Sequence, residues 1–295
     1  MKRKDRKITF LRVLRMAYLF INIAAMLVPL IFMFLNAFKT DSEITLRPFG
    51  FPSEGGAVVQ NIRDVINGTI TIRGKVRLTL TPYFTMLKNT VVLTVFPMIL
   101  MLVCSTLCAY ALGRMKFKFK WLVASLIFIC QTVPYFGYMY PMFFELNFLG
   151  LLNSLTGVIP VYVAVSMPSS IILMIGFFNV FPAAVEEAAM IDGCNEFQKF
   201  TRIVVPMSRG IIGSMAVINF MGYWNEFAIV SLMLTSPETR TLNMGVFLTQ
   251  NDMKGINAKN YVFALLALSA IPNLLFFTLF QKNIINGISL GSVKG

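Results

Sequence analysis

The sequence contains no histidine, and only four of its 295 residues are cysteines. Histidine is the commonest general base and the commonest metal ligand in proteins, so its absence argues against the usual catalytic and metal centres. Three of the cysteines, Cys104, Cys108 and Cys130, fall in apolar runs, where cysteine usually packs as a small hydrophobic residue. We therefore expect no metal site, no disulfide framework and no enzyme active site.

A phosphate-binding loop is missing as well. Gly74-Lys75 does not belong to one, because no glycine stands five residues earlier and Val76 occupies the place where serine or threonine is required. We expect the chain to bind no cofactor itself, so any ATP used in its function would be hydrolysed by a partner chain.

Charged residues are scarce, at 13% of the chain, whereas a soluble domain carries roughly 25%. Hydrophobic residues make up 57% and the mean hydropathy is +0.72, which is typical of a membrane protein. The net charge of +13 does not indicate nucleic-acid binding, because the basic residues lie at the ends of apolar segments rather than on a folded basic face.

Six stretches are long and apolar enough to cross a bilayer, which takes about 20 residues as a helix. They lie near residues 16–38, 90–112, 121–140, 158–178, 211–234 and 261–280. The first is too long for the apolar region of a signal peptide and no cleavage site follows it, so we expect a retained span. The sequence predicts an all-α polytopic membrane protein of about six transmembrane helices, with residues 1–295 forming one transmembrane domain.

Lysine and arginine gather in alternate connecting segments, and such segments usually face the cytoplasm. This rule places the basic tail 1–15, the loop 181–209 and the tail 281–295 in the cytoplasm, and the long loop 39–88 outside. Both termini are therefore expected to be cytoplasmic.

Within the outer loop, residues 69–72 and 76–80 alternate apolar and polar side chains on either side of Arg73-Gly74-Lys75. This pattern predicts a β-hairpin at about residues 69–81. The hairpin could be a small solvent-exposed ribbon or a contact surface for an external partner, and the sequence leaves both open.

The segment 182–206 lies between the fourth and fifth apolar stretches, on the predicted cytoplasmic side. Pro182 suits the start of a helix, and Glu186 and Glu187 follow early in it, where carboxylates face the positive end of the helix dipole. Gly193 is placed to end this helix in a left-handed conformation.

A second helix is expected directly afterwards. Asn195 can cap it, with Gln198 completing a capping box, and Pro206 is expected to stop it. The product would be a rigid helix–turn–helix in which Ala188 and Ala189 leave one face small enough to enter a groove. An amphipathic loop on the membrane surface is the alternative, but anionic lipid favours Lys and Arg over the acids found here.

This loop resembles the signature of the permease subunits of bacterial ABC importers: Glu-Ala-Ala, three residues, Gly, nine residues, Ile, one residue, Leu, Pro. The sequence departs from that signature only at Val205, which keeps the apolar character. The resemblance implies the type I importer permease fold and a loop that docks on a separate ATPase. The implied docking residues are Glu187, Ala188, Ala189, Asp192, Gly193, Ile203 and Pro206.

Other segments resemble the carbohydrate branch of that family, the maltose-type permeases, over nearly the whole chain. They are Phe38-Lys39-Thr40, Asn89, Ala109-Tyr110-Ala111-Leu112, Trp224-Asn225-Glu226-Phe227, Thr241-Leu242 and the tail from Gly291 to Gly295. The implied function is to form half of the path for a sugar or oligosaccharide across the bacterial inner membrane. The implied partners are a second permease, usually a different chain, an extracytoplasmic solute-binding protein, and ATPase subunits that hold ATP and Mg²⁺.

Glu226 is the one clear carboxylate inside a predicted span, where an ionisable group is costly and usually functional. With Trp224 and Asn225 it could contact sugar hydroxyls along the path. The alternative is a polar clamp between helices, with Trp224 as an interfacial anchor.

Two other functions stay open at the level of sequence. The signature loop alone fits a permease of the same superfamily for a solute other than a sugar. A proton-coupled secondary transporter is less favoured, because it would be expected to hold several buried carboxylates. The sequence does not specify which sugar is carried.

Overall fold

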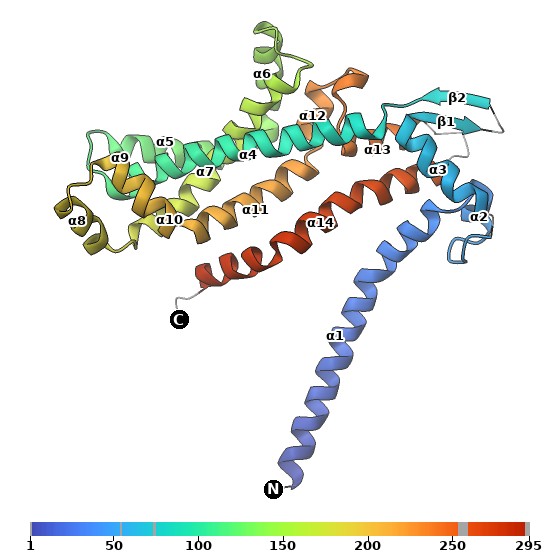
Figure 1. Cartoon of the computed structure of the whole chain (residues 1–295), viewed down its shortest axis with the longest axis horizontal. Helices are drawn as coiled ribbons and strands as arrows, with labels where there is room; N and C mark the ends of the chain where they lie inside the picture. The colour runs from blue at the N-terminus through green and yellow to red at the C-terminus, as the bar shows by residue number, and fades with distance from the viewer. Residues whose placement is uncertain (1, 54, 73–74, 253–258, 293–295) are drawn as a thin grey trace. The chain divides into compact units, whose positions relative to one another are not determined.

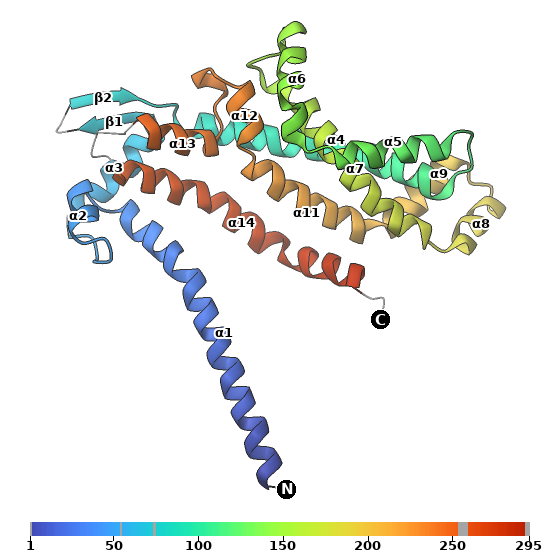
Figure 2. The same ribbon diagram turned by 180° about the vertical axis from the view of Figure 1, so that it is seen from behind.

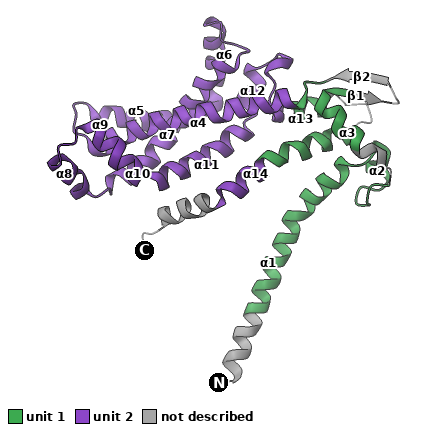
Figure 3. Ribbon diagram, viewed as in Figure 1, with its two compact units in different colours: residues 1–83, 245–272 green, residues 84–244, 273–295 purple. Residues whose placement is uncertain are grey.

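The computed structural model describes the backbone of residues 2–53, 55–72, 75–252 and 259–292, and the side chains of residues 12–53, 59–69, 80–250 and 259–281. Apart from one short hairpin its regular structure is helical, which confirms the all-α class expected from the sequence. The chain divides into two compact units (Figure 3). Unit 1 comprises Met1–Tyr83 and Gly245–Pro272, and unit 2 comprises Phe84–Met244 and Asn273–Gly295.

Unit 1 begins with the long helix α1 (Lys2–Ala37), whose apolar window is not buried by the rest of the chain (Figure 1). Short elements follow it: α2 (Asp41–Leu46), α3 (Gly55–Asn67), β1 (Thr69–Ile72) and β2 (Lys75–Thr79). The unit also contains the later part of α13 (Leu242–Asp252) and the first part of α14 (Lys259–Ser292).

The hairpin predicted from the alternating pattern is present in unit 1. Its two strands pair antiparallel, with Thr69 opposite Thr79 and one shift of register. Gly68 precedes the hairpin at a φ of 71°, and a Cβ on it would lie 2.4 Å from the carbonyl oxygen of Leu80, so a larger residue does not fit. The turn residues 73–74 lie outside the described residues.

A fully buried lysine joins α1 to the segment that follows it. The Lys39 ammonium donates to Asn36 Oδ1 at 3.1 Å and to the carbonyl oxygens of Arg47 and Pro48 at 2.9 and 2.8 Å. Burial lowers the pKa of Lys39, and the nearby Glu43 carboxylate opposes that shift. The three oxygens satisfy the donors of the ammonium group and hold the outer segment against the end of α1.

Unit 2 contains most of the remaining helices. They are α4 (Tyr83–Arg114), α5 (Lys120–Thr132), α6 (Tyr135–Phe148), α7 (Leu155–Asn179), α8 (Ala183–Ile191), α9 (Glu196–Lys199), a π-helical turn (Phe200–Val204), α10 (Val205–Met207), α11 (Arg209–Asn225), α12 (Ala228–Met233) and a 3₁₀ turn (Pro237–Thr239). α7 packs against both α5 and α11 (Figure 2).

Two clusters of buried side chains form the core of unit 2. One contains Tyr162 of α7, Tyr223 of α11 and Met233 of α12. The other contains Tyr110 of α4 and Phe178 of α7, together with residues of the loop that follows α7. The second cluster matters for function because it fixes the loop to the ends of two long helices.

Among the described residues, four helical segments are long and apolar enough to cross a membrane: Arg12–Ala37, Tyr83–Arg114, Leu155–Asn179 and Lys259–Gln281. Two bent helix pairs raise the number to six if each pair counts as one span. The second of these pairs joins Glu196–Met207 to α11 at an angle of 72°. α14 continues to Ser292, and residues 293–295 of the tail predicted at 281–295 lie outside the described residues.

The third predicted span, 121–140, is not one continuous helix. α5 and α6 meet at an angle of 100° around Val133 and Pro134. Pro134 has no N–H to continue the helix and disfavours a helical backbone at the residue before it, and Val133 is accordingly extended, with a ψ of 119°.

Candidate functional site

The loop between α7 and α11 begins with the helix that the sequence predicted. Pro182 stands at the N-cap of α8, and Glu186 lies in its first turn. Gly193 ends the helix at a φ of 77°. The backbone N–H of Cys194 donates to the Ala189 carbonyl at 3.0 Å, and that of Gly193 donates to the Met190 carbonyl at 3.1 Å. This pair of hydrogen bonds is a Schellman motif, which closes the helix end and sets the direction of the next segment.

The second helix of the loop also begins as predicted. Asn195 Oδ1 accepts from the Gln198 backbone N–H at 2.8 Å, and Gln198 Oε1 accepts from the Asn195 backbone N–H at 3.0 Å. These two bonds form a complete capping box. The backbone groups at the two helix ends beside Gly193 thus have hydrogen-bond partners. The loop is therefore a rigid element rather than a flexible connection.

The prediction that Pro206 stops the second helix is wrong. The helix continues through the π-helical turn into α10, and the chain bends at Ser208 instead. Pro206 comes directly after the π-helical turn, near the end of this helix at Met207. The N–H of Val205 donates to the Phe200 carbonyl, which is the wider spacing of a π turn.

The residues expected to dock on a partner do not all face outward. Glu187, Ala188, Asp192 and Gly193 are exposed. The others are covered by the protein: Ala189 is buried, and Ile203 and Pro206 are half-buried. The exposed acids have large exposed apolar neighbours in Met190, Ile191 and Phe197. An acidic and apolar surface on a rigid helix–turn–helix suits a protein partner.

The loop is fastened to the end of α4 in a way that the sequence did not reveal. Arg114, the last residue of α4, donates to the Glu186 carboxylate at 2.7 and 2.9 Å. The Tyr110 ring packs against Phe178 of α7 and Phe200 of the loop, with centroids 5.7 and 5.2 Å apart. From sequence, Arg114 counted only as a basic inner residue, because a pair separated by 72 positions leaves no local signal.

The second candidate group, Trp224, Asn225 and Glu226, lies where α11 ends, so the continuous fifth span predicted at 211–234 is wrong. Glu226 has an extended backbone with a ψ of 128°. Its Oε1 accepts from the Ile229 backbone N–H at 2.9 Å and so caps the start of α12. Glu226 therefore stands at the junction where α11 ends and α12 begins.

These three side chains do not converge on one point. Trp224 is buried and stacks on Phe220 with ring centroids 5.5 Å apart. The exposed Asn225 donates back to the Met221 carbonyl at 2.8 Å. The indole is therefore used in packing, whereas Asn225 is exposed and Glu226 is half-buried.

Two tyrosines that sequence reasoning missed lie within electrostatic reach of Glu226. Its carboxylate interacts electrostatically with Tyr135 of α6 and with Tyr162 of α7. Tyr162 stacks on Tyr223 at 5.1 Å and 15°, and the Tyr223 hydroxyl is hydrogen-bonded to Ser166. Tyr162 and Tyr223 are buried in the core, whereas Tyr135 is half-buried, so Tyr135 is the phenol that a sugar could reach together with Glu226.

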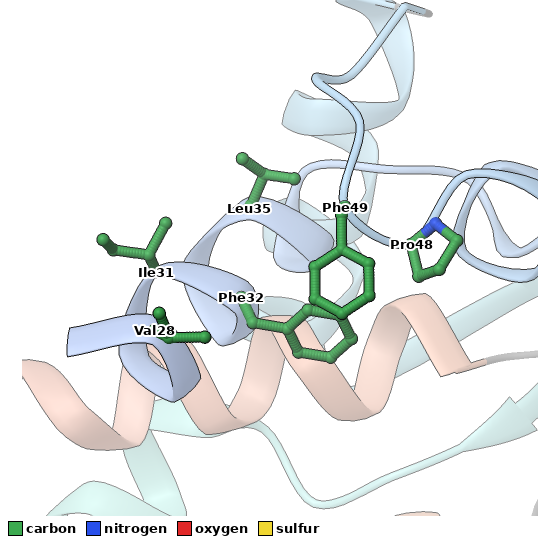
Figure 4. A pocket seen from close by; sticks show the side chains of 6 residues that line it. All are labelled: Val28, Ile31, Phe32, Leu35, Pro48 and Phe49. Carbon is green, nitrogen blue, oxygen red and sulfur yellow. The ribbon is translucent and has the colours of Figure 1, made fainter. Parts of the chain in front are cut away.

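A cavity of about 180 Å³ in unit 1 has a different character. Its lining side chains come from α1 and from the segment after α2, and Phe32 lies over Phe49 (Figure 4). The full lining is Val28, Ile31, Phe32, Leu35, Pro48 and Phe49. All six side chains are apolar, so the cavity has no side-chain group that could orient a sugar.

Comparison with known proteins agrees with this arrangement. The chain is 29% identical to the diacetylchitobiose uptake system permease of Streptomyces coelicolor, over 91% of this chain and 84% of that one. It is 30% identical to the trehalose/maltose transport system permease of Thermococcus litoralis, over 71% of this chain and 75% of that one.

A solved structure matches over most of the fold. It is the crystal structure of a bacterial ABC transporter involved in the import of the acidic polysaccharide alginate, with a TM-score of 0.76 at 21% identity over 92% of this chain and 95% of the matched chain. Residues 102–289, which include the loop and the Glu226 region, match the family described as the binding-protein-dependent transport system inner membrane component. The chain therefore belongs to that family, as a multi-pass membrane permease whose role is transport rather than catalysis.

Proposed function

We propose that this permease forms half of the translocation path of an importer for sugars or oligosaccharides, and that the loop 187–206 couples it to a separate ATPase. The observation that carries the proposal is the rigid loop, closed at Gly193 and capped at Asn195, which leaves Glu187 and Asp192 exposed. A rigid helix fixed at both ends transmits force to the spans, whereas a flexible loop does not.

The sugar class is supported by two independent features. The relatives are named for the uptake of diacetylchitobiose and of trehalose or maltose. In addition, Asn225 and Glu226 lie at a break between helices, and the Glu226 carboxylate is within electrostatic reach of the half-buried Tyr135, so polar groups and one aromatic ring are offered together. Trp224 would support the path by packing and would not contact the sugar, because its ring is already stacked within the protein.

The proposed assembly has three kinds of protein partner. ATPase subunits would bind ATP and Mg²⁺, since the sequence holds no phosphate-binding loop. A second permease would complete the path, and an extracytoplasmic solute-binding protein would deliver the sugar. The proposed site is the bacterial inner membrane, with both termini and the loop in the cytoplasm, in keeping with the distribution of lysine and arginine.

The test compares ATPase binding and sugar uptake in variants of the assembled importer. We expect Gly193→Val to lose ATPase binding and uptake, because a left-handed backbone costs a β-branched residue roughly 1–2 kcal/mol or more and would distort the docking turn. Glu187→Lys is expected to do the same by reversing an exposed charge. ATPase binding is measured by copurification from detergent.

Two controls separate this effect from general damage. Gly193→Asn should keep ATPase binding, because asparagine adopts the left-handed conformation readily. Gly213→Val is the matched control. A Cβ at either glycine would meet open space, and of these two glycines Gly193 alone has a positive φ. Normal ATPase binding and uptake in both Gly193→Val and Glu187→Lys would refute the docking proposal.

A further inference from the structure

A buried ion pair joins the proposed coupling loop to a long apolar helix. Glu186 is 7% exposed, and its Oε2 accepts from both Nε and Nη2 of Arg114. Arg114 is the last residue of α4, and Glu186 lies in the first turn of α8. The pair therefore connects the proposed coupling loop with the long apolar helix α4.

Because Glu186 is buried, the loss of its ion pair would be energetically costly. A buried carboxylate is tolerated only when a partner compensates its charge, and loss of either partner leaves the other charge uncompensated. Arginine also holds Glu186 with two donors in a fixed planar fork, so it restrains direction as well as distance. An exposed loop that only docked on a partner would not need such an anchor on its inner side.

Two further contacts fix the distance that the ion pair spans. A Cβ added to Gly113 would lie 2.8 Å from Phe178 Cβ, so this glycine lets the ends of α4 and α7 approach closely. On the other arm of the loop, Phe200 packs on Tyr110, and Val204 is fully buried. Both arms of the loop are thus held against the same end of α4.

We propose that Arg114 and Glu186 are positioning residues that form an ionic clamp, through which movement of the coupling loop is transmitted to α4. This inference rests on the proposed coupling function. When the ATPase pair closes on the exposed face of α8, the clamp moves the end of α4 together with that helix. Without the clamp, α8 still docks on the ATPase, but its movement is no longer passed on to the span.

The loop contains a matched control for this idea. Lys199 Nζ lies 2.8 Å from Glu196 Oε1, almost the same separation as the 2.7 Å of the clamp, and Lys199 is also buried. This second pair joins residues three positions apart on a single helix and bridges no two elements. Breaking it with Glu196→Gln removes a charge pair from the loop without releasing the loop from α4.

The experiment uses the complete importer in proteoliposomes, with the sugar that its binding protein retains from a mixture of diacetylchitobiose, trehalose and maltose. The quantity measured is sugar uptake per ATP hydrolysed, normalised to assembled complex. We expect Glu186→Gln and Arg114→Met to keep the ATPase bound while the ratio falls about tenfold, within the usual range of coupling between sites. Glu196→Gln should leave the ratio near that of the unchanged protein.

Two further variants keep the test decisive if the single substitutions weaken folding. Arg114→Lys preserves the charge but loses the two-donor fork, so it should retain part of the ratio, more than Arg114→Met does. Arg114→Met combined with Glu186→Gln should lower the ratio no further than either change alone, because the two residues act as one unit.

An unchanged ratio in the single variants, or losses that multiply in the double variant, would overturn the clamp. Failure of the proposed function looks different, because it appears as normal ATPase binding and uptake in Gly193→Val and Glu187→Lys.

Discussion

At the scale of single residues, each buried charge in the described part of the chain has at least one named partner. Four charged side chains are buried among the described residues: Lys39, Asp64, Glu186 and Lys199. Lys39 donates to three oxygens, and Asp64 accepts from the Tyr261 hydroxyl at 3.0 Å and from the side-chain amide of Gln60 at 2.7 Å. Lys39, Asp64 and Glu186 each join two segments of the chain, whereas Lys199 pairs with Glu196 on its own helix.

Glu226 differs from these four because it is only half-buried, and its Oε1 accepts from the backbone N–H of Ile229. Its carboxylate therefore has acceptor capacity to spare, since one oxygen caps α12 and two oxygens can accept several hydrogen bonds. A half-buried carboxylate with free acceptors beside tyrosines can bind a hydroxylated solute as well as cap a helix.

We expect Glu226→Gln to slow sugar uptake about fivefold, because a hydrogen bond to a neutral amide is weaker than one to a carboxylate. Thermal stability in detergent should be unchanged, since the amide oxygen of Gln can still accept from the Ile229 backbone N–H. Glu226→Ala, which removes the cap too, should lower both uptake and stability. Uptake by Glu226→Gln equal to that of the unchanged protein would limit this residue to capping α12.

At the scale of elements, helix ends decide how the apolar segments are used. The chain turns by 100° at Pro134 and by 72° at Ser208, and it breaks again at Glu226. Each break leaves N–H or C=O groups that need partners, and at the last of them the Glu226 carboxylate accepts from the Ile229 backbone N–H.

The capping box of the second loop helix offers a test at this scale. We expect Asn195→Ala to destabilise that helix by about 1 kcal/mol, because two backbone N–H groups lose or weaken their acceptors. Hydrogen exchange of the amides in residues 196–204 should become faster. Gln198→Glu preserves a capping box and serves as the control. Equal protection of these amides in Asn195→Ala and in the unchanged protein would contradict the capping argument.

At the scale of the whole molecule, the described residues provide up to six spans, and unit 2 carries both candidate sites. Most side chains of α1 in residues 16–31 are apolar and exposed, which is expected for a segment covered by lipid or by a second permease. The orientation of the chain rests on charge distribution, and it can be tested directly with cysteines.

We expect a membrane-impermeant maleimide to label Cys194 only in inside-out vesicles, in a variant whose other cysteines are replaced by serine. Cys194 lies in the loop that we place in the cytoplasm, and it is half-buried and free. The control is Phe51→Cys in a chain without other cysteines, because Phe51 is 87% exposed in the outer segment and should react only in right-side-out vesicles. The opposite pattern would reverse the proposed topology.

Much of this protein could be predicted from its sequence because the signals are local. Apolar length indicated the spans, alternation indicated the hairpin at Thr69–Ile72 and Lys75–Thr79, and the caps at Gly193 and Asn195 indicated the loop. The predictions that were wrong at Pro134 and Pro206 both concerned whether a proline ends or bends its helix. The effect of a proline depends on whether the carbonyl that it leaves free finds another partner.

The sequence by itself determined the membrane class, the near absence of catalytic chemistry and the residues of the loop, since each follows from composition or from spacing within a few turns. Only the tertiary structure decided that Glu186 meets Arg114, that Glu226 caps α12 instead of standing within a span, and that tyrosines from α6 and α7 approach it. Those contacts join segments far apart in the chain, and they depend on packing, which adjacent residues do not specify.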